Sequence, residues 1–316
     1  MIAVIGAGNW GKNLVRTFAG LGVLSAIAEA SDELRAELAK DYPQVDLHPD
    51  YSALLDAAEI KAVAIATPAP THHAVAKVFL EGGKDVFVEK PMTMTAAEAE
   101  NLVGIAEKNG RILMVGHLLL YQPAIEKIKS MLDEGAVGKV FTILQERKKL
   151  GRARKVENVL WSFGVHDVAV LLHLVGDAPT QVSAVGHCGL QPGLVIEDDV
   201  YLHLEFTNGI QAHLHNSWLW PEDRRCLTII GAEGALVYNE IEQTVKLHRQ
   251  SIDPETLDIT NEGVEIVHEG AKQPLEIELA HFLDCIKTRQ NPKSDGRSGL
   301  EVIRILEKAK ISNNHP

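Results

Sequence analysis

The chain has 316 residues, of which 46% are hydrophobic, and its formal net charge at pH 7 is −12. This length is enough for two domain cores, and the acidic balance argues against nucleic acid as a partner. The three cysteines stand apart in the sequence, which favours a reducing, cytoplasmic location over a disulfide framework. No apolar run could span a bilayer and Met1 leads directly into a predicted strand, so we expect neither a membrane segment nor a signal peptide.

A glycine-rich turn follows the first predicted strand, residues 2–5, and leads into a helical pattern of apolar residues. In such a turn the first glycine permits a tight bend, the second lets backbone approach a pyrophosphate, and the third lets the helix pack on the strand. The order strand, turn, helix therefore predicts a dinucleotide site. Its residues are Gly6, Gly8, Asn9, Trp10 and Gly11.

Glu29 ends the second predicted strand, residues 23–28, about 20 residues after the glycines. A carboxylate there accepts hydrogen bonds from a ribose diol and repels a 2′-phosphate, and no Arg or Lys intervenes before Arg35. This pattern favours NAD over NADP. The alternative is that Glu29 only begins the next helix.

Two further predicted strands end in loops that could reach a cofactor. Residues 61–66 lead to Thr67, Pro68 and His72, a loop made rigid by proline, which could lie against the nicotinamide end of a cofactor or merely begin a helix. Repeated strand and helix units up to residue 115 predict a doubly wound parallel sheet, the Rossmann arrangement.

The second of these strands, residues 86–88, ends at Glu89, Lys90 and Pro91. Ligands of such sheets bind at the carboxyl ends of the strands, and a partly desolvated lysine there could donate a hydrogen bond to a substrate oxygen. The alternative is a salt-bridged surface lysine.

From residue 180 onward the pattern predicts an antiparallel sheet with a hairpin turn at Thr207-Asn208-Gly209. His203, His213 and His215 alternate on its strands, but no acid or cysteine completes a zinc site, so no metal is expected. We expect a sheet face or an oligomer interface there instead.

Three motifs follow one another along the chain: Gly6-x-Gly8-x-x-Gly11, Thr67-Pro-x-x-x-His72 and Glu89-Lys90-Pro91. They resemble the Gfo/Idh/MocA oxidoreductase family. The resemblance implies an NAD-binding Rossmann domain over residues 1–118 and a substrate-binding α/β domain over residues 119–316. The large, mostly antiparallel open sheet of the second domain would make a homodimer or homotetramer. The resemblance also implies oxidation of a sugar CH–OH group, with Lys90 at the substrate hydroxyl and with Thr67, Pro68, His72 and Glu89 at the cofactor.

The stretch from Trp161 to Asp167 is similar to the second catalytic element of that family. His166 fits the general base, because a neutral imidazole can take an alcohol proton as hydride leaves. Its alternative is a core histidine at a helix start. The resemblance implies substrate contacts from Tyr121, Trp161, Ser162 and Asp167.

Two positions depart from the common family pattern: Ser162 replaces an Asp and Leu120 replaces an Arg. These differences weigh against polyol or inositol substrates. Residues 116–121 and 158–161 instead resemble the nucleotide-sugar branch, which implies oxidation of UDP-N-acetylglucosamine at C3, toward amino-sugar or surface-polysaccharide biosynthesis. The alternatives are the corresponding uronate, another sugar, or a non-catalytic NAD(H) sensor, which would not need both Lys90 and His166.

A basic run lies between these segments: six of the nine residues 147–155 are Arg or Lys. A diphosphate needs such neutralisation, and arginine suits it through bidentate contacts, so Arg147 and Arg152 are predicted to bind the substrate diphosphate. A solvated charged face is the alternative.

Overall fold

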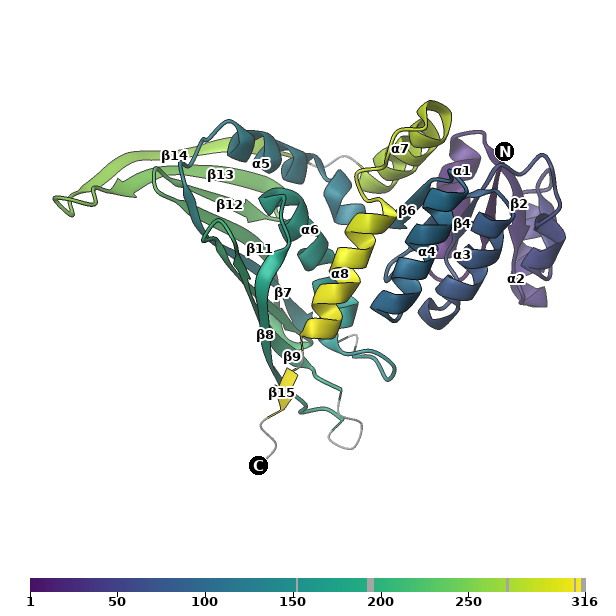
Figure 1. Ribbon diagram of the computed structural model, residues 1–316, viewed down its shortest axis with the longest axis horizontal. Coiled ribbons are helices and arrows are strands. Elements are labelled where there is room, and N and C mark those ends of the chain that lie inside the picture. Colours follow the sequence, from purple (N-terminus) through teal and green to yellow (C-terminus); the bar gives the residue numbers. More distant parts are fainter. Residues whose placement is uncertain (152, 192–195, 271–272, 310, 314–316) are drawn as a thin grey trace. The chain divides into compact units, whose positions relative to one another are not determined.

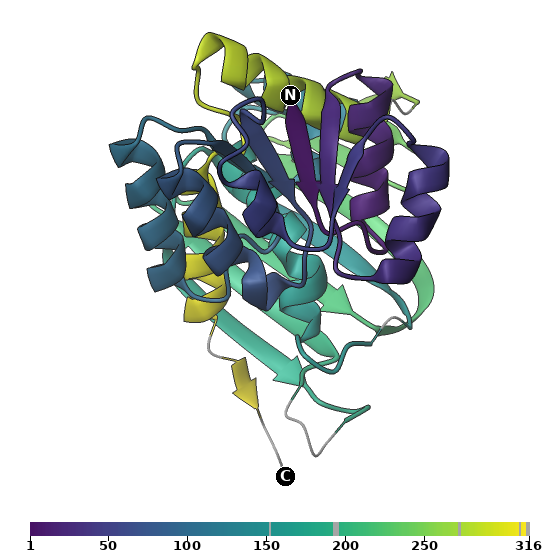
Figure 2. The same ribbon diagram turned by 90° about the vertical axis from the view of Figure 1, so that its right-hand side faces the viewer.

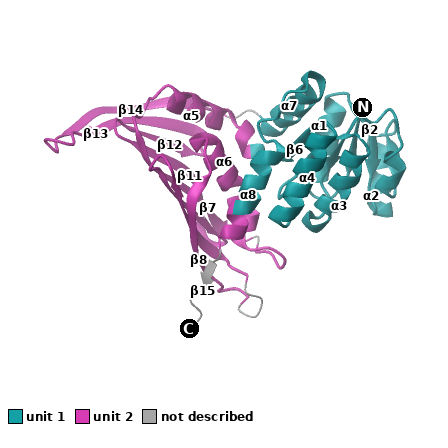
Figure 3. Ribbon diagram, viewed as in Figure 1, with its two compact units in different colours: residues 1–118, 273–304 teal, residues 119–272, 305–316 magenta. Residues whose placement is uncertain are grey.

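The computed structural model describes residues 1–151, 153–191, 196–270, 273–309 and 311–313. The chain forms two compact units, coloured in Figure 3: unit 1 comprises residues 1–118 and 273–304, and unit 2 comprises residues 119–272 and 305–316. The first boundary coincides with the predicted one. The predicted second domain of residues 119–316 needs a correction, because residues 273–304 return to unit 1.

Unit 1 is built on a six-stranded sheet in the order β3-β2-β1-β4-β5-β6, with every neighbouring pair parallel. The strands are β1 (Ile2–Ile5), β2 (Leu24–Ala28), β3 (Asp46–His48), β4 (Ala62–Ile65), β5 (Asp85–Glu89) and β6 (Leu113–Gly116). Every residue of β1, β4, β5 and β6 is buried, as expected for strands covered on both faces. The predicted doubly wound parallel sheet is confirmed.

Helices lie on both sides of this sheet (Figure 2). They are α1 (Gly11–Gly20), α2 (Asp32–Asp41), α3 (His72–Glu81) and α4 (Ala96–Lys108). Leu14, Val15 and Phe18 form the buried stripe of α1. Thr95 caps α4 by accepting a hydrogen bond from the Glu98 N–H at 3.2 Å, because a threonine oxygen can satisfy a free amide of the first turn.

The returning segment brings α7 (Pro274–Thr288) and the start of α8 (Gly296–Lys308). Phe282 of α7 packs on Phe87 of β5 with ring centroids 5.7 Å apart. Arg289, which ends α7, donates to both oxygens of Asp85 at 2.7 and 2.9 Å. These aromatic and ionic contacts are the physical reason that residues 273–304 belong to unit 1.

Unit 2 is built on a nine-stranded sheet in the order β14-β13-β12-β11-β7-β10-β9-β8-β15. The strands are β7 (Val140–Leu150), β8 (Pro179–His187), β9 (Asp199–Phe206), β10 (Gln211–Ser217), β11 (Leu219–Gly231), β12 (Ala235–Asn239), β13 (Thr244–Ile252), β14 (Ile259–Glu269) and β15 (Ile311–Asn313). Only the pairs β7–β10 and β8–β15 are parallel, so the mostly antiparallel sheet is confirmed.

One face of this sheet carries α5 (Pro123–Asp133) and α6 (Val165–Val175), as Figure 1 shows, and no described helix of unit 2 covers the other face, here called the open face. The predicted hairpin joins β9 to β10, with Gly209 at φ +84° and Asn208 Oδ1 accepting from the Ile210 N–H at 3.1 Å. His203 and His213 pair across it on the open face. Within the described residues, no helix is both long and apolar enough to cross a membrane.

Candidate active site

The predicted cofactor residues gather at one edge of the six-stranded sheet, where its strands end. Gly6 follows β1, Glu29 follows β2, Thr67 comes two residues after β4, and Lys90 follows β5. His117 directly follows β6. Since the strands are parallel, all these loops leave the same edge, which is where open α/β sheets bind ligands.

The glycine loop has the geometry that a dinucleotide needs. A Cβ at Gly6, whose φ is +86°, would come within 3.0 Å of the Ala66 carbonyl oxygen, and a Cβ at Gly11 would come within 2.0 Å of the Gly6 oxygen. A Cβ at Gly8 would meet nothing within 4 Å. Packing therefore demands two of the glycines, and the third leaves open backbone that a pyrophosphate could approach.

Glu29 lies against this loop. Its Oε2 accepts from the Ala7 N–H at 2.7 Å and its Oε1 accepts from the Ser31 N–H at 2.9 Å. Arg35 lies beside it and donates to the Glu29 carbonyl oxygen at 2.5 Å. A carboxylate fixed at the glycine turn fits the ribose end of a dinucleotide, so these residues suit NAD.

His72 ties the loop after β4 to the loop after β5. Its Nδ1 lies 2.8 Å from the Pro91 carbonyl oxygen and its Nε2 lies 2.8 Å from the Thr67 carbonyl oxygen. Burial lowers the pKa of His72, although the two carbonyl contacts oppose this, and a neutral ring can donate to only one of the two oxygens. The predicted cofactor residue His72 is thus a buried bridge that helps to position the Lys90 loop.

Glu89 ties the same loop to the glycine loop. Trp10 Nε1 donates to Glu89 Oε1 at 2.5 Å, and the carboxyl group lies over Gly116, where a Cβ would come within 3.0 Å of Oε2. Burial raises the pKa of Glu89 to about 7, opposed by the Trp10 hydrogen bond and the charge of Lys90. Glu89 can therefore change its charge in the physiological range.

His117 is buried close enough to Lys90 to sense its charge. Burial, and then that charge, lower the pKa of His117 to about 3, so the ring is neutral. Neither ring nitrogen has a hydrogen-bond partner in the described part of the chain. The charge of Lys90 also lowers the pKa of His72, so an ammonium group lies near two neutral imidazoles. Such a cation suits an oxygen that gains negative charge during reaction.

His166 lies in the first turn of α6, preceded by a π-helical turn, Leu160–Gly164. π-Helical turns are rare in proteins, and those that occur are often found at functional sites. A Cβ at Gly164 would come within 2.5 Å of Leu160 Cδ1 and 2.7 Å of Asn216 Oδ1, so a larger residue would displace these two side chains. His166 and Trp161 are partly exposed, whereas Ser162 and Tyr121 are buried. Substrate contact by these residues stays a prediction.

Arg147 has surroundings other than those predicted for a diphosphate ligand. It is only 8% exposed, and its Nε donates to Asp167 Oδ1 at 2.8 Å. Its Nη1 and Nη2 donate to the two oxygens of Glu240 at 3.1 and 2.7 Å. Burial would lower the pKa of Arg147, but the two carboxylates outweigh burial and raise it. Arg147 does make a bidentate contact, but its partner is the carboxylate of Glu240 and not the predicted diphosphate.

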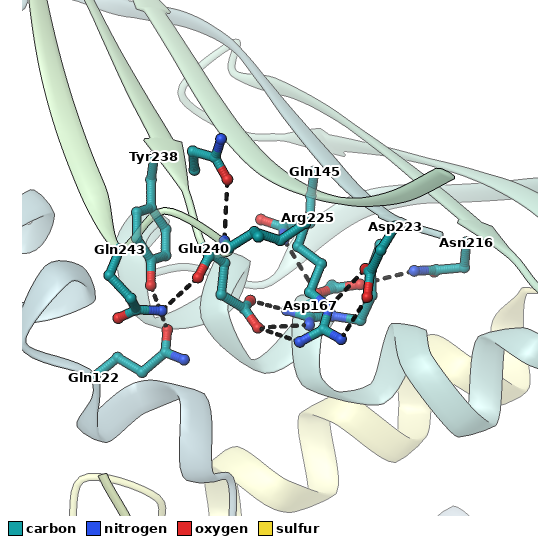
Figure 4. Close-up of polar contacts among 12 residues, drawn as sticks. Gln122, Gln145, Asp167, Asn216, Asp223, Arg225, Tyr238, Glu240 and Gln243 are labelled. Atoms are coloured by element: carbon teal, nitrogen blue, oxygen red, sulfur yellow. Dashed lines mark hydrogen bonds and ion pairs between the residues drawn. The ribbon is translucent and has the colours of Figure 1, made fainter. Parts of the chain in front are cut away.

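Asp167, which we predicted to contact the substrate, is fully buried in the structure. It accepts from Gln145, Arg147 and Asn216, so it connects α6 to β7 and β10 (Figure 4). Burial raises the pKa of Asp167, although the hydrogen bonds from Arg147 and Asn216 oppose this. Asp167 therefore positions the helix that carries His166.

The rest of the basic run divides between two environments. Lys148 is buried on the open face of the sheet, where its Nζ donates to Glu146 Oε1 at 2.8 Å and to His215 Nδ1 at 3.1 Å. Arg154 and Lys155 are exposed. Arg152 lies outside the described residues. Alternation along β7 places Arg147 and Lys148 on opposite faces of the sheet, whereas Arg154 and Lys155 lie beyond the end of this strand.

Comparisons with known proteins cover both units. Residues 1–117 match the model of the oxidoreductase family with an NAD-binding Rossmann fold, and residues 125–237 match the GFO/IDH/MocA C-terminal domain. The chain belongs to the Gfo/Idh/MocA oxidoreductase family. It is an NAD-dependent dehydrogenase acting on a CH–OH group, and the similar proteins described next include two that are named dehydrogenases.

Several similar proteins align with nearly the whole chain. UDP-N-acetylglucosamine 3-dehydrogenase of Acidithiobacillus ferrooxidans is 26% identical over 98% of this chain and 96% of its own. One of its crystal structures superposes with a TM-score of 0.84, covering 97% of this chain and 95% of its own. The structure of a protein described as an oxidoreductase from Magnetospirillum magnetotacticum is 31% identical, with a TM-score of 0.84 and coverage of 98% and 99%. The NAD-dependent scyllo-inositol 2-dehydrogenase of Bacillus subtilis is 27% identical over 92% of this chain and 87% of its own.

Sequence reasoning assigned no role to three residues that matter in this Gfo/Idh/MocA protein. His117 could have been found, because it directly follows a buried strand at the same sheet edge as Lys90. Glu240, the partner of Arg147, and Glu278, a buried carboxyl on α7, carry no local signal. The partner of Glu240 lies 93 residues away in the sequence, and the burial of Glu278 near Glu89 is known only from the fold.

Proposed function

We propose that this dehydrogenase oxidises the C3 hydroxyl of UDP-N-acetylglucosamine to a 3-keto sugar. The observation that carries the chemistry is the placement of Lys90: it leaves the carboxyl edge of the NAD-binding sheet, between Glu89 and the His72 bridge. Two buried imidazoles near it have lowered pKa values, to which the charge of Lys90 contributes, and Lys90 is the cation in this proposal. This is the group that a forming carbonyl oxygen needs.

Lys90 and His166 have distinct roles in the proposal. His166 takes the proton of the substrate hydroxyl, which a neutral imidazole can do near physiological pH. Lys90 donates a hydrogen bond to the same oxygen as the carbonyl forms. Bound NAD supplies the hydride acceptor, and the glycine loop and Glu29 hold its phosphate and ribose parts. We further propose that Glu29 makes NAD preferred over NADP.

Two observations support the choice of sugar. The relative that is 26% identical over 98% of this chain is named for UDP-N-acetylglucosamine and for position 3. Leu120 stands where many family members carry an arginine, and its side chain is buried, which weighs against a polyol. The similarity to an inositol dehydrogenase makes inositol the natural competitor to test.

A diphosphate contact remains part of the proposal without Arg147. The exposed residues of the basic run, Arg154 and Lys155, together with Arg152, are the candidates. Arg154→Glu should weaken binding of a nucleotide sugar while leaving NADH binding unchanged. Equal nucleotide-sugar affinity in this variant and the wild type would show that the exposed run is a solvated face.

The deciding experiment offers NAD with four substrates: UDP-N-acetylglucosamine, its uronate, free N-acetylglucosamine and myo-inositol. NADH absorbance reports turnover, and the product is analysed for a keto group at C3. We expect turnover with UDP-N-acetylglucosamine. Turnover with the uronate alone would make the uronate the substrate. Turnover with only inositol or the free sugar would refute the proposal.

We also propose a homodimer or homotetramer formed through the open face of the nine-stranded sheet. Val185 and Tyr201 lie opposite each other on that face with about half of each side chain exposed, and Leu144 and Ile230 add apolar surface. Exposed apolar area of this kind is typical of an interface between subunits. Light scattering should show a dimer or tetramer, and Tyr201→Glu should shift it toward monomer.

A further inference from the structure

Among the described residues of unit 1, three side-chain carboxyl groups are buried, and Asp85 is paired with Arg289. The other two are the carboxyl groups of Glu89 and Glu278. Glu89, at the end of β5, is 8% exposed, and Glu278, on α7, is 1% exposed. Helix α7 packs against α1, the helix that the glycine loop begins. Buried acids are rare unless they are paired or functional, so both need an explanation.

Glu89 joins the two loops that matter for the reaction. It accepts the Trp10 indole N–H at 2.5 Å, and it is the residue before Lys90. Gly116 allows the carboxyl group to lie close against β6, since any side chain there would meet Oε2 at 3.0 Å. Trp10 itself is 41% exposed, so one edge of the indole is held by Glu89 and the rest of the ring is accessible. A change at Glu89 is therefore transmitted both to the glycine loop and to Lys90.

Glu278 is the member of the pair that stays protonated. Its Oε1 is buried and has no hydrogen-bond partner among the residues that the structure describes. Burial, and then the charge of Glu89, raise the pKa of Glu278 well above its ordinary value. The presence of this neutral acid leaves Glu89 as the carboxyl that ionises.

We propose that Trp10 and Glu89 form a proton-controlled clasp between the glycine loop and the Lys90 loop, and that this clasp sets the affinity for NAD(H). Trp10 and Glu89 are positioning residues in this proposal, and Glu278 is the neutral neighbour that keeps the second negative charge away. The clasp lies within unit 1 and does not depend on which sugar the enzyme oxidises.

The direction of the pH effect follows from the groups around Glu89. Burial raises the pKa of Glu89 to about 7, so the carboxyl is neutral below that pH and ionised above it. A hydrogen bond to an ionised acceptor is about twice as strong as one to a neutral acceptor, so the clasp tightens as pH rises through about 7. The other charged or titratable groups that act on or sense Glu89 are Lys90 and Glu278. His117, which follows Gly116 and senses Lys90, has a pKa of about 3 and stays neutral throughout.

The test measures NADH binding to the full-length protein between pH 6 and pH 8, without any sugar. For the wild type we expect the dissociation constant to be about threefold to fivefold larger at pH 6 than at pH 8. Glu89→Gln keeps an acceptor for Trp10 but cannot ionise, so its affinity should not vary with pH. Trp10→Phe removes the donor and should bind NADH more weakly, again without pH dependence.

Glu278→Gln is the matched control, because it makes the same carboxyl-to-amide change at the neighbouring buried position. It should keep the pH dependence of the wild type, since Glu278 is already neutral. A pH dependence that survives in Glu89→Gln, or one that disappears in Glu278→Gln, would overturn the proposal. An unchanged wild-type affinity across this range would do the same.

A cofactor-free measurement covers the case in which a variant does not fold. The indole N–H resonance of Trp10 in ¹⁵N-labelled wild-type protein should shift with a midpoint near pH 7, the value to which burial raises the pKa of Glu89. The three other tryptophans serve as internal references. A Trp10 resonance that does not move would refute the clasp, whereas failure of the sugar assay alone would refute only the proposed substrate.

Discussion

The two units each bury a polar cluster, and the clusters differ in how their charges are balanced. In unit 1, Glu89 and His117 have pKa values far from their ordinary ranges, and His117 lacks a hydrogen-bond partner among the described residues. In unit 2, Arg147 donates to Asp167 and to both oxygens of Glu240. A charge whose partners are all supplied by the protein stabilises one structure, whereas a shifted group beside an exposed side chain is available for chemistry. Burial and partners, rather than the number of charged residues, separate a site from a scaffold.

Removing Lys90 should give the largest effect and would test whether the unit 1 cluster is the reactive one. We expect Lys90→Ala to lower turnover by about 10²–10⁴-fold, since a positioned acid–base group contributes that much. His166→Ala should lose turnover to a similar degree. Both variants should still bind NADH, because Glu29 and the glycine loop are intact.

Lys77→Ala is the matched control for Lys90, since Lys77 lies on the surface of α3 in the same unit with 41% of its side chain exposed. Its turnover should equal that of the wild type. Near-normal rates in Lys90→Ala would remove this residue from the mechanism and reduce the unit 1 cluster to a structural one.

Arg147 tests the scaffold role of the unit 2 cluster. Arg147→Met leaves the buried Asp167 without its cation and leaves Glu240 with the longer contact to Arg225 at 3.4 Å, which should lower the free energy of unfolding by about 3–5 kcal/mol. Urea denaturation measures this loss. Lys155→Met, which also replaces a cation by methionine but at an exposed position of the basic run, should alter stability by less than about 0.5 kcal/mol. If Arg147→Met were as stable as the wild type and bound nucleotide sugars poorly, the result would support the predicted binding of the substrate diphosphate by Arg147.

Gly116 tests how closely Glu89 is packed in unit 1. Gly116→Ala would place a Cβ 3.0 Å from Glu89 Oε2 and 3.1 Å from Phe87 Cζ, which should cost about 1–3 kcal/mol of stability. Gly104→Ala is the control, because a Cβ on that exposed glycine of α4 meets nothing within 4 Å. It should stabilise the protein by about 0.5–1 kcal/mol. Thermal unfolding measures both changes in stability. Changes of the same sign in the two variants would contradict the close packing of Glu89 on Gly116.

Glu29 tests whether the unit 1 cluster selects the cofactor, and its replacement has the smallest effect expected among these variants. Glu29→Ala should narrow the preference for NADH over NADPH by about tenfold, or 1.4 kcal/mol, since the repulsion of a 2′-phosphate is lost. Arg35, which already lies beside Glu29, would become the counter-ion of the 2′-phosphate of NADPH. Binding constants for both cofactors measure the ratio, and the double variant with Arg35→Ala should lose the gain for NADPH. Equal affinity of the wild type for both cofactors would contradict the role of Glu29.

The sequence by itself determined the sheet edge of unit 1. Gly6, Glu29 and Glu89 each come directly after a short apolar stretch, with Lys90 next in the chain. Alternation of such stretches with helical patterns specifies parallel strands. Parallel strands end at a common edge, so residues far apart in the chain were expected together before the fold was known. Gly209 and Asn208 likewise predicted their hairpin, because the conformation of a turn is a local property.

Only the tertiary structure decided which charged side chains are buried and with which partners. Arg147 and Lys155 belong to one basic run, yet Arg147 pairs with Glu240 from beyond β12 and Asp167 from α6, while Lys155 is exposed. Glu278 lies on α7, which returns to unit 1 from the far end of the chain. Local patterns of polarity encode strands, helices and turns, but the partner of a buried charge is set by which distant segments the folded chain brings into contact.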